Sequence, residues 1–338
     1  MNLTQLPYII AIASTGSLSA AARQLGISQP ALSKYLKNVE RDVGQSLFIR
    51  NKNRHIPTPA GQIYLNTARQ ILNLYNNTFA AVAAMQSRQQ STIRLGISPN
   101  RGISMLAAVY PEFDQRFPNV QIQPREGIAR QFPGMLLDGT LDLAFTTHSG
   151  PLPDGLRAIP KQREELVLAV PSFHPLVKHH TFLLEELPYA DLKDFRNNVF
   201  VSPGPNSTMH RLILELFREE GITPEVGAAA QNLLIQEAMI RSGTKVGLLP
   251  AYYIKPNPDI AYFRLKNPPI LTSCCLLREE KELSEAEEFL LYLSFRDGLS
   301  HPNSKPDWNE ATQRLMRKFD PLEAMSFGME ADYEHENP

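Results

Sequence analysis

The chain has 338 residues, of which 43% are hydrophobic and 20% are charged. A single hydrophobic core stops growing near about 250 residues, so this length predicts roughly two or three domains. No stretch approaches the ~18 uninterrupted apolar residues that cross a bilayer, which excludes a membrane-embedded class and a membrane partner. The first residues lack the basic and apolar regions of a secretory signal, and we therefore expect a cytoplasmic protein.

The charge of the chain is unevenly distributed. Residues 1–92 carry nine Lys or Arg against two acidic residues, a net charge of +7, whereas the other 246 residues sum to −8. A basic segment attached to an acidic body favours a polyanionic partner for the basic segment alone.

The N-terminal segment is predicted to hold three short helices: Leu3–Ala13, Leu18–Leu25, and one from Ser28 to about Val39. Ser17 and Ser28 are suited to cap the second and third helices, and Gly26 to end the second. Two helices joined by so short a turn are typical of a helix-turn-helix, whose second helix enters the major groove of DNA.

The polar face of the third helix is the predicted DNA-reading surface. The residues that we expect to contact double-stranded operator DNA there are Ser28, Gln29, Pro30, Ser33, Lys34 and Lys37. The alternative is the solvated polar stripe that any surface helix has. The cap, the short turn and the neighbouring basic residues together favour base or phosphate contact.

The pattern of residues 46–56 predicts two short strands around a polar tip, which indicates a wing after the helix-turn-helix. Arg50, Lys52 and Arg54, together with His55, lie where a wing would meet phosphate or the minor groove. Such contacts give affinity and register more than choice of sequence. Arg50 would be a plain surface cation in most other contexts.

Thr58 and Pro59 begin a helix that continues to about Arg88 without a breaker after Gly61. Apolar residues alternate spacings of three and four along it, among them Ile71, Tyr75, Val82 and Met85. About thirty residues make a rod of roughly 45 Å, which is too long for a core helix and suits a two-stranded coiled coil. The helix therefore predicts a dimer.

From Ser91 onward strands and helices alternate, which indicates mostly parallel sheets covered on both faces. A first set has predicted strands at 93–97, 120–123 and 141–145. A second set begins at Glu165 and has further strands at 198–202, 246–250 and 260–265. The strand ILTSCCLL and a helix over Ser284–Asp297 follow. The pattern predicts two similar α/β lobes.

Polar residues follow several of these strands, at the edge where α/β sheets bind ligands and helices begin. The predicted effector-binding residues are Ser98, Asn100, Arg101, Thr146, Thr147, His148, Ser202, Asn206, Ser207 and Thr208. The alternative for each is an ordinary helix cap or loop residue. Two helix N-termini with Arg101 nearby favour a carboxylate or other anion as the ligand.

Other reactive side chains are interpreted as structural. Cys274 and Cys275 are adjacent in an apolar strand, which allows no disulfide framework and favours an inert buried pair, with a redox-active thiol as the alternative. His174, His179 and His180 lie in one loop without cysteine or paired carboxylates at ligand spacing, so we expect no metal site.

The sequence shows no nucleophile with a base and an orienting group, no glycine-rich phosphate loop and no zinc-protease motif. We therefore expect no enzyme and no cofactor besides a non-covalent effector. The alternative is an enzyme or a solute-binding domain fused to a winged helix. Salt-dependent DNA binding would separate these classes, because only a regulator requires it.

One ordered set of motifs is more specific than the rest: residues 17–25, 27–33, Glu40, Gly44, 47–50 and 58–61. In these residues the chain resembles the LysR-type transcriptional regulators, and weaker similarity extends to about residue 298. The resemblance implies a winged helix-turn-helix, a linker helix, and two α/β lobes like those of periplasmic binding proteins, joined by two crossover strands. It also implies homodimers that pair into tetramers and an effector held between the lobes, with RNA polymerase as a candidate partner.

The resemblance sets the expected domains. These are a DNA-binding domain over 1–58, a linker helix over 59–90, an effector domain over 91–298 and an atypical extension over 299–338. Lobe I is expected at about 91–164 and 270–298, and lobe II at about 165–269. Tyr8 and the segment Lys34–Lys37 depart from the family pattern conservatively.

The extension is the larger departure and holds the only tryptophan, Trp308. We expect Asp307 to cap an amphipathic helix that docks on the body or on another subunit, with a flexible appendage as the alternative. The acidic end, from Met329 to Pro338, is expected to be disordered.

Overall fold

A computed structural model of the chain describes residues 6–51, 54–86, 91–99, 101–148, 150–301, 303 and 305–320. The predicted site residues Lys52 and Asn100 lie outside these ranges, as does the acidic end of the extension. The chain divides into two compact units, Met1–Ser91 with Gly134–Leu141, and Thr92–Pro133 with Asp142–Pro338.

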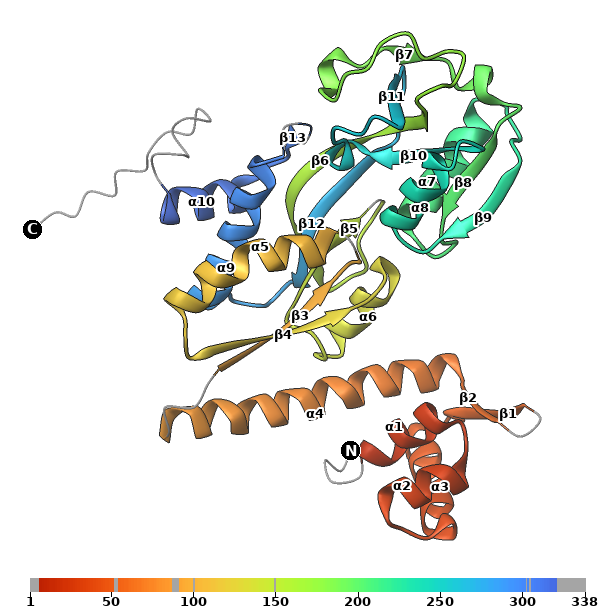
Figure 1. Cartoon of the computed structure of the whole chain (residues 1–338). Helices are drawn as coiled ribbons and strands as arrows, with labels where there is room; N and C mark the ends of the chain where they lie inside the picture. The colour runs from red at the N-terminus through yellow and green to blue at the C-terminus, as the bar shows by residue number, and fades with distance from the viewer. Residues whose placement is uncertain are drawn as a thin grey trace, which may run out of the picture. The chain divides into compact units, whose positions relative to one another are not determined.

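The N-terminal unit begins with a winged helix whose elements are α1 (Leu6–Thr15), α2 (Leu18–Leu25), α3 (Gln29–Val43), β1 (Phe48–Asn51) and β2 (Arg54–Pro57) (Figure 1). The Ser17 and Ser28 hydroxyls accept the backbone N–H groups of Ala20 and Ala31, and Gly26 ends α2 at φ +67°. The predicted caps and turn are confirmed. The first helix ends at Thr15 rather than Ala13.

Glu40 joins α3 to the wing. Its carboxylate accepts the backbone N–H of Leu47 at 2.7 Å and that of Phe48 at 3.3 Å. Leu47 is fully buried and Phe48 nearly so, in the core that α1, α2 and α3 share. These bonds fix where the wing leaves the helical core, and hydrogen bonds to a charged acceptor are the stronger kind.

The long helix α4 runs over Pro59–Gln86, 28 residues. The Thr58 hydroxyl accepts the N–H of Gly61 at 2.9 Å and donates to the carbonyl of Ser46 at 2.7 Å, so the predicted start is confirmed. Leu65, in the first turns, is buried in the winged-helix core. The N-terminal end of α4 is therefore part of that domain rather than a separate rod.

The second unit contains two lobes (Figure 1). Lobe I is built from β3 (Ser91–Ile97), α5 (Arg101–Arg116), β4 (Val120–Glu126), η2 (Ala129–Gln131), β5 (Leu143–His148), β12 (Ile270–Arg278) and α9 (Glu285–Leu299). Helix α6 (Phe132–Leu137) follows η2 in the chain, and most of its residues belong to the first unit. Helices α5 and α9 supply much of the core of lobe I, with Phe113 and Leu290 fully buried. The predicted return of the C-terminal strand and helix to lobe I is confirmed.

Lobe II has its own core. Its elements are η3 (Leu184–Glu186), β7 (Tyr189–Ala190), η4 (Leu192–Phe195), β8 (Val199–Pro203), α7 (Thr208–Glu219), β9 (Val226–Ala230), α8 (Leu233–Arg241), β10 (Lys245–Pro250), η5 (Ala251–Tyr253) and β11 (Ile260–Leu265). Phe195, Ile240 and Leu249 are fully buried in it.

One strand belongs to both lobes. Strand β6 spans Leu156–Pro171, 16 residues, and pairs with β12 as far as Glu165, then with β10 and β11 from Leu166 onward. All three pairings are antiparallel. The expectation of mostly parallel sheets is therefore wrong. Parallel pairs occur within each lobe, β3 with β5 and β8 with β10. Strand β12, however, runs antiparallel to β5 and β6, and β6 runs antiparallel to β10 and β11.

The described part of the extension is docked, as predicted, and its helix starts later than expected. Helix α10 (Glu310–Phe319) is capped by Asn309, not by Asp307, which instead donates its backbone N–H to the carbonyl of Lys161. The apolar face of α10 buries Leu315 and Met316 in the core of lobe I. Before it, strand β13 (Lys305–Pro306) adds to the edge of β6.

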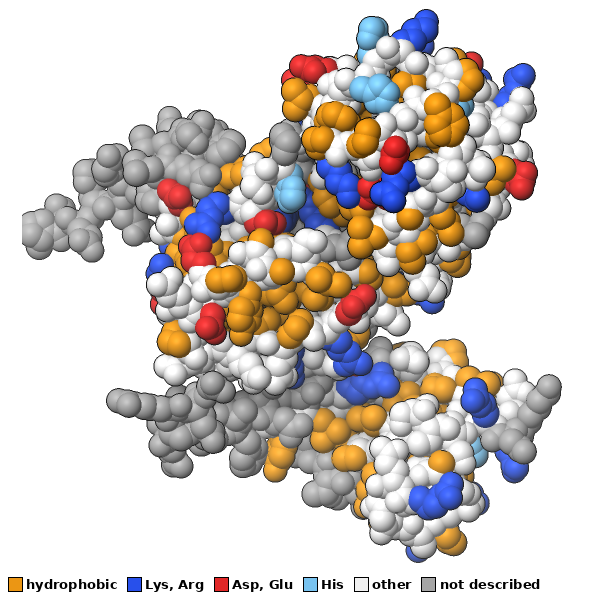
Figure 2. All heavy atoms as spheres, viewed as in Figure 1, with side chains coloured by type: hydrophobic (Ala, Val, Ile, Leu, Met, Phe, Trp, Pro, Cys, Tyr) orange, Lys and Arg blue, Asp and Glu red, His pale blue; other side chains and the backbone are white. Residues whose placement is uncertain are grey.

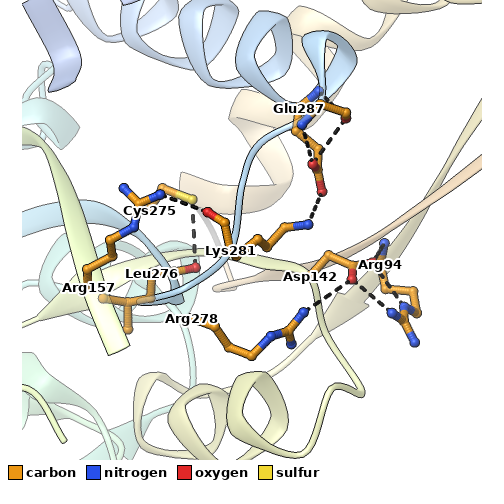
Figure 3. Close-up of polar contacts among 9 residues, drawn as sticks. Arg94, Asp142, Arg157, Cys275, Leu276, Arg278, Lys281 and Glu287 are labelled. Atoms are coloured by element: carbon orange, nitrogen blue, oxygen red, sulfur yellow. Dashed lines mark hydrogen bonds and ion pairs between the residues drawn. The ribbon is translucent and has the colours of Figure 1, made fainter. Parts of the chain in front are cut away.

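A network of charged side chains ties the strands of lobe I together (Figure 3). Arg94 on β3 donates through its backbone N–H, Nε and Nη2 to the carboxylate of Asp142, at 2.8–2.9 Å. Lys281 pairs with Glu287 at 2.9 Å, and Glu287 closes a capping box with Ser284 at the start of α9. Asp142 is buried, and burial opposes ionisation, but the bonds from Arg94 hold its pKa below the ordinary value.

Asp142→Asn is expected to lower the free energy of unfolding by about 2 kcal/mol at pH 7, because bonds to an ionised group are the stronger kind. A carboxyl whose pKa is lowered in the folded state stabilises above its unfolded pKa of about 4 and loses that contribution below it. Urea unfolding at pH 7 and pH 3.5 checks this. The difference in the free energy of unfolding between variant and parent should shrink at the lower pH. The control Asp154→Asn, at an exposed position, should leave the free energy of unfolding unchanged at both pH values.

Candidate DNA interface and effector cavity

The predicted recognition residues lie at the start of α3. Gln29, Lys34 and Lys37 are exposed and Ser33 is half-buried, while Pro30 occupies the first turn. The Gln29 side-chain carbonyl accepts a hydrogen bond from the Ser19 hydroxyl of α2 at 2.8 Å. This bond holds the amide of Gln29 in one orientation on the surface, where its NH₂ group can donate to a base edge.

Two of the three predicted wing cations, Arg50 and Arg54, lie within the described residues. Arg50 and Arg54 are exposed, on antiparallel strands that pair Arg50 with His55. The backbone N–H of His55 donates to the carbonyl of Gly16 at 2.8 Å and so anchors β2 to the end of α1. Lys and Arg side chains are visible across this domain in Figure 2.

Gln29→Ala should weaken specific binding by about 1–3 kcal/mol and spare non-specific binding, because a base contact is lost. Arg50→Ala should instead weaken all sequences alike and reduce the salt dependence, as loss of a phosphate contact does. Titrations of operator and scrambled DNA at several salt concentrations measure both. Equal losses on the two DNAs for Gln29→Ala would contradict its assignment to base reading.

A cavity of about 400 Å³ lies between lobes I and II. Of the predicted effector residues, the cavity is lined by Ser98, Arg101, Thr147, Asn206, Ser207 and Thr208. The end of β3, the start of α5 and the end of β5 supply the first three, and the loop from β8 into α7 supplies the others. Residues at the carboxyl ends of strands in both lobes therefore meet at one cavity, as expected for α/β sheets.

Three other predicted residues do not line this cavity. Strand β5 continues through His148 instead of ending at Phe145, so Thr146 and Thr147 point to opposite faces. Thr146 borders a small adjoining cavity with Cys274, and the His148 ring contacts the carbonyl of Gly150. Ser202 is buried against His210, whose Nδ1 lies 2.6 Å from its hydroxyl.

The comparisons with known proteins match both halves of the chain. Residues 3–62 match the family described as "Bacterial regulatory helix-turn-helix protein, lysR family", and residues 86–293 match "LysR substrate binding domain". The chain belongs to the LysR family. It is therefore a DNA-binding transcription regulator with an effector-binding domain.

Relatives of this LysR-family regulator match it over most of their length. It is 27% identical over 328 residues to a "Probable RuBisCO transcriptional regulator" of Trichormus variabilis, covering 94% of this chain and 93% of that protein. The full-length OxyR variant of Pseudomonas aeruginosa has the same fold at 19% identity, with a TM-score of 0.61 over 87% of this chain and 98% of the other. The structure of CbnR with its target DNA aligns with a TM-score of 0.52 at 23% identity, over 88% of this chain and 98% of the other.

The cavity of this LysR-family regulator contains a buried ion pair that the sequence reasoning missed. Arg101 at the start of α5 pairs with Glu164 of β6, and it donates a second bond to the side-chain carbonyl of Gln162. Only 1% of the Glu164 side chain is exposed. The Arg101 guanidinium lies over the ring of Tyr252 from lobe II, 4.4 Å from its centroid. No spacing rule links Glu164 to Arg101, because one lies on β6 and the other on α5, and only the tertiary fold brings them together.

Burial sets the ionisation of the groups around this pair. It raises the pKa of the Tyr252 hydroxyl to about 12, which Arg101 partly opposes, so the phenol is neutral. Burial, and then repulsion from Arg101, lower the pKa of Lys161 to about 7, although Asp297 lies 3.8 Å away and favours the charged form. The charge of Arg101 is thus coupled to that of Lys161, which borders the small adjoining cavity.

Lobe II contributes a further missed residue. Gln236 of α8 is fully buried and lines the cavity, and its NH₂ donates to the carbonyl of Leu248 at 2.9 Å. Its side-chain oxygen has no hydrogen-bond partner among the described residues. A buried polar atom without a partner is costly and is the kind of group that a ligand satisfies.

The remaining candidates are structural in their contacts. Cys274 and Cys275 are buried, and burial raises the pKa of both thiols, which favours the inert interpretation. The His174 ring stacks on Phe195 in lobe II. Across the described ranges, no three His, Cys, Asp or Glu side chains are grouped so as to hold a metal ion. None of the helices in those ranges is long and apolar enough to cross a membrane.

Proposed function

We propose that this regulator binds operator DNA through α3 and the wing, and that a small organic molecule held between lobes I and II controls its action. The observation that carries the proposal is the cavity of about 400 Å³, which lies within the range of ligand sites in proteins. Both lobes contribute to its wall, so a bound molecule would interact with each and favour one arrangement of the two lobes over another.

The lining of the cavity supports a ligand with an apolar body and hydrogen-bonding groups. Ile128, Leu233, Leu271 and several prolines supply apolar surface, and hydroxyls and amides lie among them. Glu164 offsets the charge of Arg101, and the side chains of Ser207 and Asn232 already cap α7 and α8. These pairings weaken the expectation of a simple anion. We propose a ligand of low net charge, whose polar groups reach Arg101 and Gln236.

A thermal-shift screen of the full chain against metabolites tests this proposal, because a ligand that binds only the folded state raises the melting temperature. Ala129→Trp would fill the cavity from η2 and should abolish the shift, whereas Ala129→Ser should keep it. A ligand found in this way should change the salt-dependent gel shift on DNA upstream of the protein's own gene. A hit that shifts Ala129→Trp as much as the parent would place the ligand elsewhere.

We propose that α4 forms a homodimer interface, with tetramers built from such dimers. Leu74 on this helix is 70% exposed and Tyr75 is 46% exposed, which is much apolar surface for a helix. Ile71 is half-buried, and the side chains of Val82 and Met85, also predicted for the seam, lie outside the description.

Leu74→Glu should place like charges across a two-fold interface and convert the dimer to a monomer with weaker operator binding, by roughly tenfold or more. Because Leu74 is exposed within one chain, the substitution should leave the monomer fold intact. Sedimentation measures the change, with the exposed Gln70→Glu as the control. A stable dimer of Leu74→Glu would move the interface away from this part of α4.

We further propose that the protein acts in the cytoplasm, does not turn over its ligand, and contacts RNA polymerase when bound to DNA. The relatives named as transcriptional regulators support a non-enzymatic role. The alternative is an enzyme fused to a winged helix. Recovery of the ligand found in the screen, chemically unchanged after incubation with the protein, would argue against that alternative.

A further inference from the structure

The C-terminal extension contacts both lobes of the effector domain. We call the described residues of this segment, 300, 301, 303 and 305–320, the strap. Its helix α10 packs on lobe I, where the Thr312 hydroxyl donates to the carbonyl of Pro160 at 2.9 Å. Its strand β13 pairs with the middle of β6, Lys305 opposite Arg163 and Pro306 opposite Gln162. This part of β6 precedes Leu166, where the strand enters lobe II. Figure 1 shows β13 beside β6 and α10 beside α9.

The strap is also bonded to lobe II through Asn303. This side chain is 5% exposed, and its oxygen accepts the backbone N–H of Leu184 at 2.7 Å, while its NH₂ donates to the carbonyl of Phe182 at 2.9 Å. A second contact lies two residues earlier, where the His301 ring meets the Tyr252 ring of lobe II edge to face, with centroids 6.1 Å apart. The described strap residues thus link lobe I, the crossover strand and lobe II.

The base of the strap is connected to the cavity. The side-chain NH₂ of Gln162 donates to the carbonyl of Gly298, at the end of α9, and the Gln162 carbonyl accepts a bond from Arg101. A Cβ at Gly298 would lie 2.7 Å from the amide carbon and nitrogen of Gln162, so an alanine there would require the Gln162 amide to shift. Arg101 therefore holds the amide that bonds to the end of α9, directly before the strap.

We propose that the strap is a third link between the lobes, which restricts their separation, and that the cavity controls it through Arg101, Gln162 and Gly298. A ligand that draws Arg101 toward itself removes a partner from Gln162 and weakens the anchor of the strap. A ligand that leaves Arg101 in place keeps the lobes restrained. The link through Asn303 needs no ligand, whereas the control by a ligand rests on the proposed function.

Distance measurements between the lobes test the link directly. Spin labels at Asp114→Cys on α5 and Glu219→Cys on α7 would report the separation, since both positions are exposed and the native cysteines are buried. Labelled protein is diluted with unlabelled protein, so that each measured pair lies in one chain. The parent should give a narrow distribution, and Asn303→Ala should broaden it. Arg314→Ala, an exposed change on α10, should not. An unchanged distribution for Asn303→Ala overturns the link.

The connection to the cavity is tested in the same labelled background. Gly298→Ala should displace the Gln162 amide and broaden the distribution as Asn303→Ala does, although it leaves Asn303 intact. Gln162→Ala should do the same and guards against a local distortion caused by the first variant. Parent-like distributions in both, with parent-like circular dichroism, overturn the control through Gln162. None of these measurements uses effector or DNA, so a failed metabolite screen and a failed strap remain distinguishable.

Discussion

Gly61→Ala is expected to disrupt the winged helix and abolish DNA binding. A Cβ at this position would lie 1.9 Å from the carbonyl oxygen of Leu47. The backbone at this oxygen cannot move freely, because the oxygen accepts the N–H of Thr58 at 2.9 Å and Leu47 is fully buried. The first turn of α4 would have to move away from the wing. Overpacking of this kind costs about 3 kcal/mol or more.

Urea unfolding followed by circular dichroism, together with operator titration, measures this effect. Gly134→Ala in α6 is the matched control, because a Cβ there meets no atom within 4 Å. That variant should keep or slightly raise the free energy of unfolding, since alanine favours a helix. A Gly61→Ala protein with parental stability and affinity would show that there is room for a Cβ between α4 and the Leu47 carbonyl.

Arg101→Met is the second change with a large expected effect. It removes the cation that neutralises the buried Glu164 carboxylate, and breaking a buried pair in this way costs about 3–5 kcal/mol. The double variant Arg101→Met with Glu164→Gln should recover much of the loss, because no charge is then left in the pair. Arg211→Met removes a surface ion pair with Glu215 and should cost less than about 1 kcal/mol.

Thermal unfolding of four proteins, the parent, Arg101→Met, Glu164→Gln and the double variant, gives the coupling between Arg101 and Glu164. If the double variant is no more stable than Arg101→Met, the two side chains do not stabilise each other, and the charge of Glu164 is compensated by other groups. The same proteins separate stability from ligand contact. A metabolite that stabilises the parent but not the double variant needs the ion pair itself.

The winged helix could be predicted closely from the sequence because its signals are local. Ser17, Ser28 and Gly26 act within three residues of the helix ends that they define, and the structure places those ends as expected. The start of α4 at Thr58 and Pro59 follows from the same kind of signal.

The effector domain was less predictable because its decisive contacts join distant residues. The hydrophobic pattern indicated strands at 141–145 and from Glu165, but the pairing with β12 extends both strands beyond these bounds. Arg101 was expected in the cavity from its place after a strand. Glu164 was not, because its partner is 63 residues away in the chain and no periodicity relates them. The cap of α10 was misplaced by two residues, since both Asp307 and Asn309 are acceptable caps.

The order of the lobes along the chain has a consequence for synthesis on the ribosome. Lobe II is assembled from one continuous stretch, whereas the core of lobe I needs β12 and α9, and also Leu315 and Met316 of α10. Domains tend to fold as their residues emerge. Lobe II should therefore reach its native packing while lobe I is still incomplete, and nascent chains halted before α10 should remain protease-sensitive in lobe I alone.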